Sequence, residues 1–119
     1  MTHKDLEVWK RSIDLVVEIY NIAKVLPSDE KYGLISQLKR SAVSIPSNIA
    51  EGAGRSSTKE FIRFLDIANG SLSELETQLI IVKRLNLHET EELIDTKIVY
   101  IRKMLFRLKE SLKRKLKKY

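Results

Sequence analysis

Apolar residues recur along the chain at alternating intervals of three and four residues, a spacing that places them on one side of an α-helix. The pattern occupies four segments, which are separated by short stretches containing proline, glycine or asparagine. It predicts helices at residues 5–26, 29–53, 58–85 and 91–117. Helices of this length joined by short turns are typical of an antiparallel up-down-up-down four-helix bundle. We therefore expect an all-α fold and a single domain spanning residues 1–119.

The stretches between these segments carry signals that end one helix and begin the next. Ser28 follows a proline and precedes two acidic residues, as expected at the start of the second helix. Residues 52–56 contain two glycines, and Ser57 with Glu60 three residues later matches a capping box for the third helix. Thr90 is expected to cap the fourth helix. The turns thus agree with the helices in number and position.

Three of the four helices have one main apolar stripe that is expected to face the core. In the second helix the stripe contains Leu38, Ala42, Ile45, Ile49 and Gly52. In the third helix it contains Phe61, Leu65, Ala68, Leu72, Leu75, Leu79 and Val82. In the fourth helix it contains Ile94, Ile98, Ile101, Leu105, Leu108 and Leu112.

The first helix has two apolar stripes, which lie nearly opposite each other. The stripe expected to face the core contains Leu6, Trp9, Ile13, Val16, Tyr20 and Ala23. The other stripe contains Val8, Leu15, Ile19 and Ile22. One core does not need two opposite faces, and an exposed aliphatic face of this size usually marks an interface. The pattern therefore predicts a homo-oligomer whose subunits meet through the second stripe.

The second helix also has a polar face, within a segment that carries an internal proline. Pro46 lacks an N–H group and its ring crowds the preceding turn, which predicts a kink. The polar face is interpreted either as a site or subunit contact, or as a solvated face beside the kink. Across the bundle, Gly70 is expected to allow a close helix approach and Ser71 to reach this face. The face contains Arg40, Ser44, Asn48, Glu51 and Arg55.

Charge is concentrated at one end of the sequence. The formal net charge is +6, and residues 102–119 contain nine basic residues and one acidic residue. This segment therefore carries +8 and the preceding 101 residues carry −2. A basic helix on a near-neutral body suits phosphate binding through counterion release. We expect binding to RNA or DNA, governed by charge and shape, through Arg102, Arg107, Lys109, Lys113, Arg114, Lys117 and Lys118.

Other classes of function lack the residues that they need. The chain has no cysteine and only two isolated histidines, so no nucleophile–base pair or metal-ligand set can be assembled from them. We therefore expect no enzymatic activity, cofactor or metal. No apolar run reaches the length of a membrane span, and the first residues lack the apolar stretch of a signal peptide. A cytoplasmic protein without a membrane partner is the expectation.

A family resemblance is carried by several sequence blocks between residues 6 and 85. Residues 44–52 read SIPSNIAEG, and with Arg55 just after them they closely resemble the signature of the 23S rRNA-intervening sequence protein family. The opening block, with VWK at residues 8–10, looks like the tryptophan-containing start of that family. Residues 37–40, which read QLKR, and the phenylalanine-containing block at residues 60–65 resemble its later motifs.

The resemblance implies a helical bundle without established enzymatic activity, which assembles as a homopentamer in relatives of known assembly. Related accessory proteins of diversity-generating retroelements bind nucleic acid and a reverse transcriptase. Two functions therefore stay open. The first is a homo-oligomeric nucleic-acid-binding protein that uses the basic fourth helix. The alternative is an adaptor for a protein partner such as a reverse transcriptase, without nucleic-acid binding of its own.

Overall fold

The computed structural model describes residues 2–117, except for the side chains of Lys31 and Tyr32. The long helices are α1 (Glu7–Val25), α2 (Ser36–Ala53), α3 (Thr58–Arg84) and α5 (Val99–Lys117). The short 3-10 helix η1 (His3–Asp5) precedes α1. The turns η2 (Ser28–Glu30) and η3 (Lys31–Ile35) lead into α2, while α4 (Glu91–Leu93) and η4 (Ile94–Ile98) lead into α5. The predicted all-α four-helix fold is confirmed.

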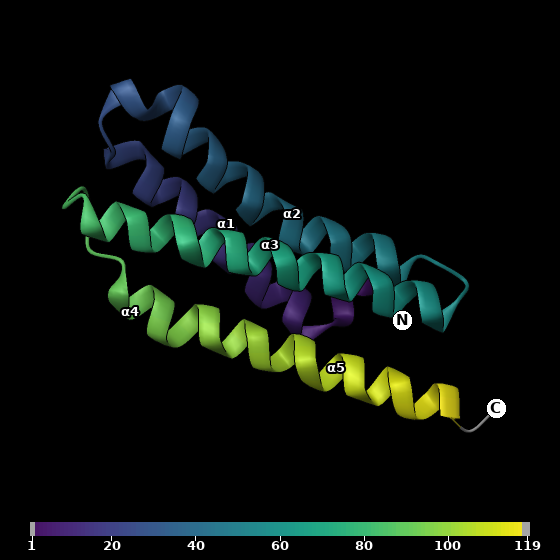
Figure 1. Ribbon diagram of the computed structural model, residues 1–119. Helices are drawn as coiled ribbons and strands as arrows, with labels where there is room; N and C mark the ends of the chain where they lie inside the picture. Colours follow the sequence, from purple (N-terminus) through teal and green to yellow (C-terminus); the bar gives the residue numbers. More distant parts are fainter. Residues whose placement is uncertain (1, 118–119) are drawn as a thin grey trace.

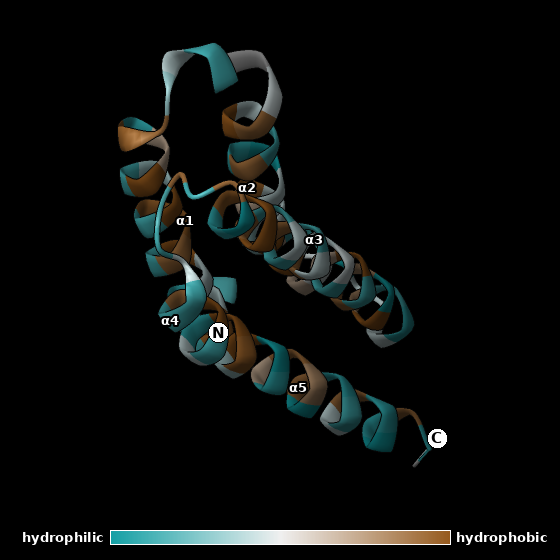
Figure 2. Cartoon of the chain, turned by 60° about the vertical axis from the view of Figure 1, so that its left-hand side comes forward, coloured by the Kyte–Doolittle hydropathy of each residue, from teal (hydrophilic) through white to brown (hydrophobic). Residues whose placement is uncertain are grey.

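The helices run antiparallel to their neighbours in the chain and form an elongated bundle of 52 × 23 × 20 Å (Figure 1). α2 and α3 lie side by side along their length, and α1 packs against α2. α5 runs beside α3 but diverges from the other helices toward its C-terminal end (Figure 2). In the second half of α5, Leu108 and Leu112 are partly buried and still pack against the other helices. Within residues 2–117, no helix is long and apolar enough to cross a membrane.

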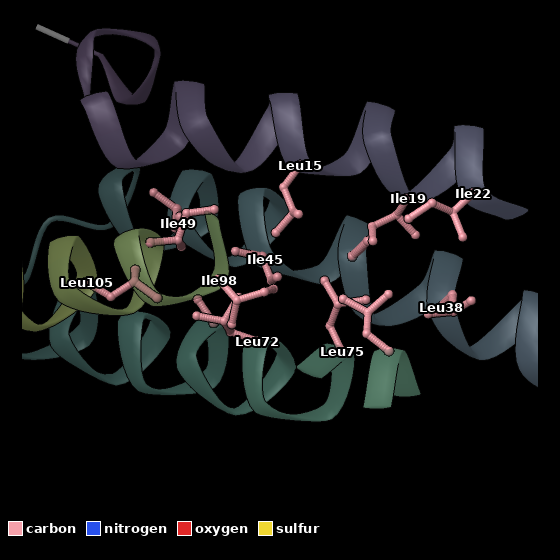
Figure 3. Packing of buried hydrophobic residues seen from close by; sticks show 14 of the residues in the cluster. Leu15, Ile19, Ile22, Leu38, Ile45, Ile49, Leu72, Leu75, Ile98 and Leu105 are labelled. Atoms are coloured by element: carbon pink, nitrogen blue, oxygen red, sulfur yellow. The ribbon is translucent and has the colours of Figure 1, made fainter. Parts of the chain in front are cut away.

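The core is a single cluster of aliphatic side chains contributed by every long helix (Figure 3). Leu38 and Ile45 from α2, Leu72 from α3 and Ile101 from α5 are each at most 1% exposed. The apolar stripes predicted for the second and third helices face this core, and so does the stripe of the fourth helix as far as Leu105. Beyond that residue the stripe is partly buried but still packs against the cluster.

The second apolar stripe of α1 lies in the core, against the sequence prediction. Val8, Leu15, Ile19 and Ile22 were expected to form an exposed subunit interface, but they are 0–9% exposed and belong to the core, where Figure 3 shows the last three. In the stripe predicted to face the core, Ile13 and Tyr20 instead lie on the outer face beside Val17, at 36%, 38% and 56% exposure. The other members of that stripe are buried or partly buried against the core: Leu6, Trp9, Val16 and Ala23. Ser12 explains the error, because it interrupts the buried stripe with a polar residue. Its hydroxyl donates to the Trp9 carbonyl at 2.7 Å, so Ser12 occupies the core as a small, satisfied side chain.

α2 and α3 approach each other most closely at Gly52. A Cβ atom on Gly52 would lie 2.7 Å from the Cβ atom of Phe64 and 3.0 Å from the Cδ1 atom of Phe61. Contacts this short do not occur between well-packed groups, so only glycine fits here. Gly70, which was expected to permit a close approach, has no heavy atom within 4 Å of its Cβ position. The tight contact is therefore made by the glycine at the end of α2.

The turns confirm most of the predicted helix boundaries. The hydroxyl of Ser57 accepts a hydrogen bond from the backbone N–H of Glu60 at 3.2 Å, which caps α3. Asn86 adopts a φ of 58°, a left-handed conformation that suits asparagine after a helix end. Thr90 precedes α4, but its buried hydroxyl donates to the Leu79 carbonyl at 2.7 Å. Thr90 thus ties the turn to α3 instead of capping α4 with its side chain.

Candidate nucleic-acid interface

The basic side chains of α5 occupy different sides of the helix. Because Ile101 and Leu105 point into the core, residues about half a turn away point outward. An outward line is formed by the exposed cations Lys103, Arg107, Arg114 and Lys117. Within residues 2–117, none of these four takes part in an ion pair, whereas Arg102, Lys109 and Lys113 do. We call these four residues the outer cationic line.

Two predicted phosphate ligands are instead held against α3. The guanidinium of Arg102 donates to the Glu76 carboxylate at 2.8 Å and to the Ser73 hydroxyl at 3.4 Å. The Nζ atom of Lys109 lies 2.6 Å from a carboxylate oxygen of Asp66. Their side chains are 34% and 29% exposed, less than the other paired cation of this helix. Arg102 and Lys109 therefore fasten α5 to α3, which is their first structural role.

The remaining predicted cations lie between residues 107 and 118. Lys113 pairs with Glu110 on the preceding turn, with 3.4 Å between nitrogen and oxygen, so part of its charge is balanced. Arg107, Arg114 and Lys117 are exposed and belong to the outer cationic line. Lys118 lies outside the residues that the structure describes.

Cations outside the predicted set also lie at this end of the bundle. Lys103 was missed, although its spacing to Arg107 and Arg114 places it on the same side of the helix. Arg63, in the first turns of α3, lies on the helix that α5 runs beside, N-terminal to the Asp66 that holds Lys109. Arg63 donates hydrogen bonds to Glu60 at 3.1 and 3.2 Å, which lower the pKa of Glu60 and raise the pKa of Arg63.

The predicted polar face of α2 is divided between an internal contact and the surface. The hydroxyls of Ser44 and Ser71 lie 2.8 Å apart across the α2–α3 interface. The side-chain amide of Asn48 donates to the same Ser44 hydroxyl at 2.9 Å and to the Ser44 carbonyl at 2.8 Å. One turn away, Ser41 donates to Gln78 at 2.7 Å. Ser71 therefore reaches Asn48 through Ser44, and the network joins α2 to α3.

The other members of the polar face stay at the surface. Glu51 and Arg55 form an exposed ion pair at 2.6 Å, and the Arg55 guanidinium lies 5.1 Å from the centre of the Phe64 ring. Arg40 is exposed. α2 continues as one helix through Pro46, and the hydroxyl of the following Ser47 donates to the Val43 carbonyl at 2.8 Å. The inner part of this face therefore joins α2 to α3, and the exposed part carries an ion pair and the separate charge of Arg40.

Comparison with known protein families gives a match over most of the chain. Residues 4–107 match the 23S rRNA-intervening sequence protein family. The chain belongs to this family. The match includes the α2–α3 polar network and Gly52, so the features that join these helices lie inside the family region. A comparison with curated individual proteins finds no match.

The family region ends within the basic helix. It stops at Arg107, so the part of α5 after that residue lies beyond it. Lys103 and Arg107 of the outer cationic line fall inside the family region, whereas Arg114 and Lys117 fall outside it. Within residues 2–117, no group of three or more histidine, cysteine, aspartate or glutamate side chains is placed to hold a metal ion.

Proposed function

We propose that this member of the 23S rRNA-intervening sequence protein family is a non-catalytic, self-associating protein that binds RNA or DNA through α5. The observation that carries the proposal is the outer cationic line. Lys103, Arg107, Arg114 and Lys117 are exposed and lack acidic partners among residues 2–117, while the apolar side of the same helix is engaged by the core. Such cations release counterions when they meet a phosphate backbone.

The dimensions of this line suit a phosphate backbone. Lys103 and Lys117 are separated by fourteen residues, which corresponds to about 21 Å along a helix. Phosphates of one duplex strand are spaced about 3.4 Å apart along the axis, so the line extends over about six of them. The long, flexible side chains follow a backbone without reading bases. The expected binding therefore depends on charge and shape and varies little with sequence.

A salt series tests the proposal directly. The double variant Arg107→Glu, Arg114→Glu reverses two charges of the outer cationic line. Its control, Lys24→Glu, Arg84→Glu, makes the same change in net charge at the opposite end of the bundle (Figure 1). Affinity for a structured RNA is measured by fluorescence anisotropy from about 50 to 200 mM salt, and each lost phosphate contact lowers the log–log slope by about 0.7–0.9.

The outcomes separate the proposal from the alternatives. The α5 variant is expected to bind more weakly and with a shallower salt slope than the control variant. An equal loss of affinity in both double variants would show that net charge alone governs binding and that the binding site does not lie on α5. No binding by the unaltered protein at low salt would overturn the proposal. Binding that appears only with a protein partner would favour the adaptor function.

Self-association is assigned here to the outer face of α1 and α2, because the stripe predicted from sequence lies in the core. Ile13, Val17, Tyr20 and Val43 are 36–56% exposed on these two neighbouring helices. A groove of about 290 Å³ runs between them and includes the half-buried Trp9. We propose a second copy of the chain as the occupant of this face, since apolar side chains from two helices are contiguous there.

Sedimentation tests this assignment. Ile13→Lys should shift the protein toward a species of 13.8 kDa, because burying a lysine at an apolar interface is unfavourable. Ile80→Lys is the matched control, since Ile80 has a similar exposure of 42% but lies on α3. A 13.8 kDa species for the unaltered protein at all concentrations would contradict self-association. Equal effects of both substitutions would contradict the choice of face.

A further inference from the structure

Gly70 occupies a position where the described structure gives glycine no packing role. It lies in the interior of α3, where glycine is less favourable than alanine by about 1 kcal/mol. Nevertheless, no heavy atom lies within 4 Å of the Cβ position, so an alanine would fit without contact. Gly70 therefore leaves bare helix surface open to the outside, next to the exposed Asn69.

Phe106 is a solvent-exposed aromatic residue among the cations of α5. It is 63% exposed, which matches the highest value among the large apolar side chains. Arg102 and Lys103 precede it by one helical turn, and Lys109 and Glu110 follow it by one turn, so three cations and one acid border the ring along the helix. The next apolar residues at the surface of this helix, Tyr100 and Leu116, lie on other sides of it. Phe106 is thus an exposed aromatic ring on a surface where cations outnumber acids.

Two cations of α5 contact α3 on either side of Phe106. Arg102 contacts Ser73 and Glu76, and Lys109 contacts Asp66, so α5 runs antiparallel along this part of α3. Phe106 lies between these two cations on α5, and residues 69 and 70 lie between their partners on α3. Asp66, Gly70 and Ser73 share one side of α3 at spacings of four and three residues. The exposed ring, the bare helix surface and the Asn69 amide therefore belong to one stretch of surface.

We propose that this stretch is a base-stacking subsite for a single-stranded nucleic acid. It comprises Phe106, Gly70 and Asn69, with Arg102 and Lys109 at its two ends. An unpaired base stacks on the Phe106 ring, and the missing side chain at Gly70 leaves room beside it. The exposed Asn69 amide can donate to and accept from a base edge. The neighbouring Lys103 and Arg107 bind the phosphates on either side.

Charge favours this occupant over another protein surface. An apolar partner helix would have to cover Lys103, Arg107 and Lys109 together with Phe106, and burying cations against apolar groups is unfavourable. A nucleic acid supplies phosphates for the cations and an aromatic face for the ring. Bases in a duplex are already stacked on each other and cannot lie on Phe106, whereas unpaired bases can. The subsite rests on the proposed function and adds to it a preference for single-stranded over duplex nucleic acid.

The experiment compares a short single-stranded RNA with the same strand annealed to its complement. The proteins are the unaltered chain and the variants Phe106→Ala, Phe106→Leu and Phe106→Trp, each checked for unchanged helicity and thermal unfolding. Loss of the aromatic ring should weaken single-strand binding roughly tenfold in both the alanine and leucine variants. Duplex affinity and the salt slope should stay unchanged. Phe106→Trp should retain single-strand binding, because its ring also stacks.

A second readout reports stacking itself. In a Trp9→Phe background, the tryptophan introduced by Phe106→Trp is the single fluorophore of its kind, and its emission should be quenched by single-stranded RNA and not by heparin. Gly70→Leu should weaken single-strand binding by filling the bare surface, whereas Gly70→Ala should not. The leucine variant therefore reports obstruction of the subsite, and the alanine variant is the control for replacing the glycine.

Each failure has a distinct meaning. The proposed subsite is overturned if Phe106→Ala binds single strands as well as the unaltered protein while Arg107→Glu, Arg114→Glu still weakens binding; the proposed function then stands. Absence of any nucleic-acid binding by the unaltered protein overturns both. A change in oligomeric mass caused by Phe106→Ala would assign the surface to contacts between copies and would also overturn the subsite.

Discussion

Replacing glycine by alanine at two positions should change stability in opposite directions. Gly52 ends α2 against α3, where an added Cβ would lie 2.7 Å from the Cβ atom of Phe64. Phe64 Cβ is bonded directly to the α3 backbone, so the clash cannot be relieved by rotating a side chain. Gly70 lies in the interior of α3, and its Cβ position has no heavy atom within 4 Å. The same chemical change therefore meets close packing at one site and open surface at the other.

The magnitudes follow from these two environments. Alanine in place of glycine stabilises a helix by up to about 1 kcal/mol, which is the expected gain for Gly70→Ala. At Gly52 this gain is opposed by overpacking, which costs about 1–3 kcal/mol and belongs near the upper end because backbone must move. Gly52→Ala should therefore lose about 1–2 kcal/mol of unfolding free energy. The two variants should differ by about 2–3 kcal/mol.

Urea unfolding followed by circular dichroism measures this difference. Both variants should show the same dependence of unfolding free energy on denaturant as the unaltered protein, with midpoints displaced in opposite directions. A Gly52→Ala variant as stable as the unaltered protein would refute the close approach of α2 and α3. A destabilised Gly70→Ala variant would show that another group covers Gly70, and the bare surface used for the proposed subsite would not exist.

Other substitutions test further parts of the fold. Leu15→Ala should cost about 2–5 kcal/mol because Leu15 is fully buried, whereas Val25→Ala, at an exposed position of α1 outside the proposed self-association face, should change stability by less than about 0.5 kcal/mol; equal effects would contradict the burial of Leu15 in the core. Ser71→Ala should cost about 1 kcal/mol through its hydrogen bond across the α2–α3 interface, also measured in urea. A hydrogen bond from Arg63 lowers the pKa of Glu60 in the folded protein. This hydrogen bond therefore contributes its full stabilisation at pH values above the pKa of Glu60 in the unfolded chain, and the contribution is lost as the pH falls through the lowered pKa of the folded protein. Glu60→Gln should therefore be less stable than the unaltered protein at neutral pH and equal to it in acid, and a difference independent of pH would contradict this assignment.

Sequence periodicity predicted the four helices and most of their boundaries. The reason is local, because helix caps and turns are formed by residues close to one another in the chain. Ser57 caps α3 through a backbone group three residues away, and Asn86 adopts its left-handed conformation at the following turn. The single apolar stripes of the second and third helices were likewise sufficient to predict which residues are buried.

The candidate interface was predicted only in part. The cluster of cations in the fourth helix was visible as a charge imbalance, but their partners on α3 were not. Arg102 and Lys109 form ion pairs with Glu76 and Asp66, which are 26 and 43 residues away in sequence. A count of charges along the sequence cannot distinguish these paired cations from the exposed Arg114. The distinction depends on which side of α5 faces α3.

The sequence by itself therefore determined the helical architecture, the family and the basic character of one helix. The tertiary structure decided which of two apolar faces of α1 enters the core, which cations remain exposed and which glycine makes the tight contact. The physical reason is that periodicity along one helix shows which residues share a side but not what that side meets. Leu15 and Ile13 are both aliphatic and lie two residues apart, yet only the packing of the other helices buries one and exposes the other.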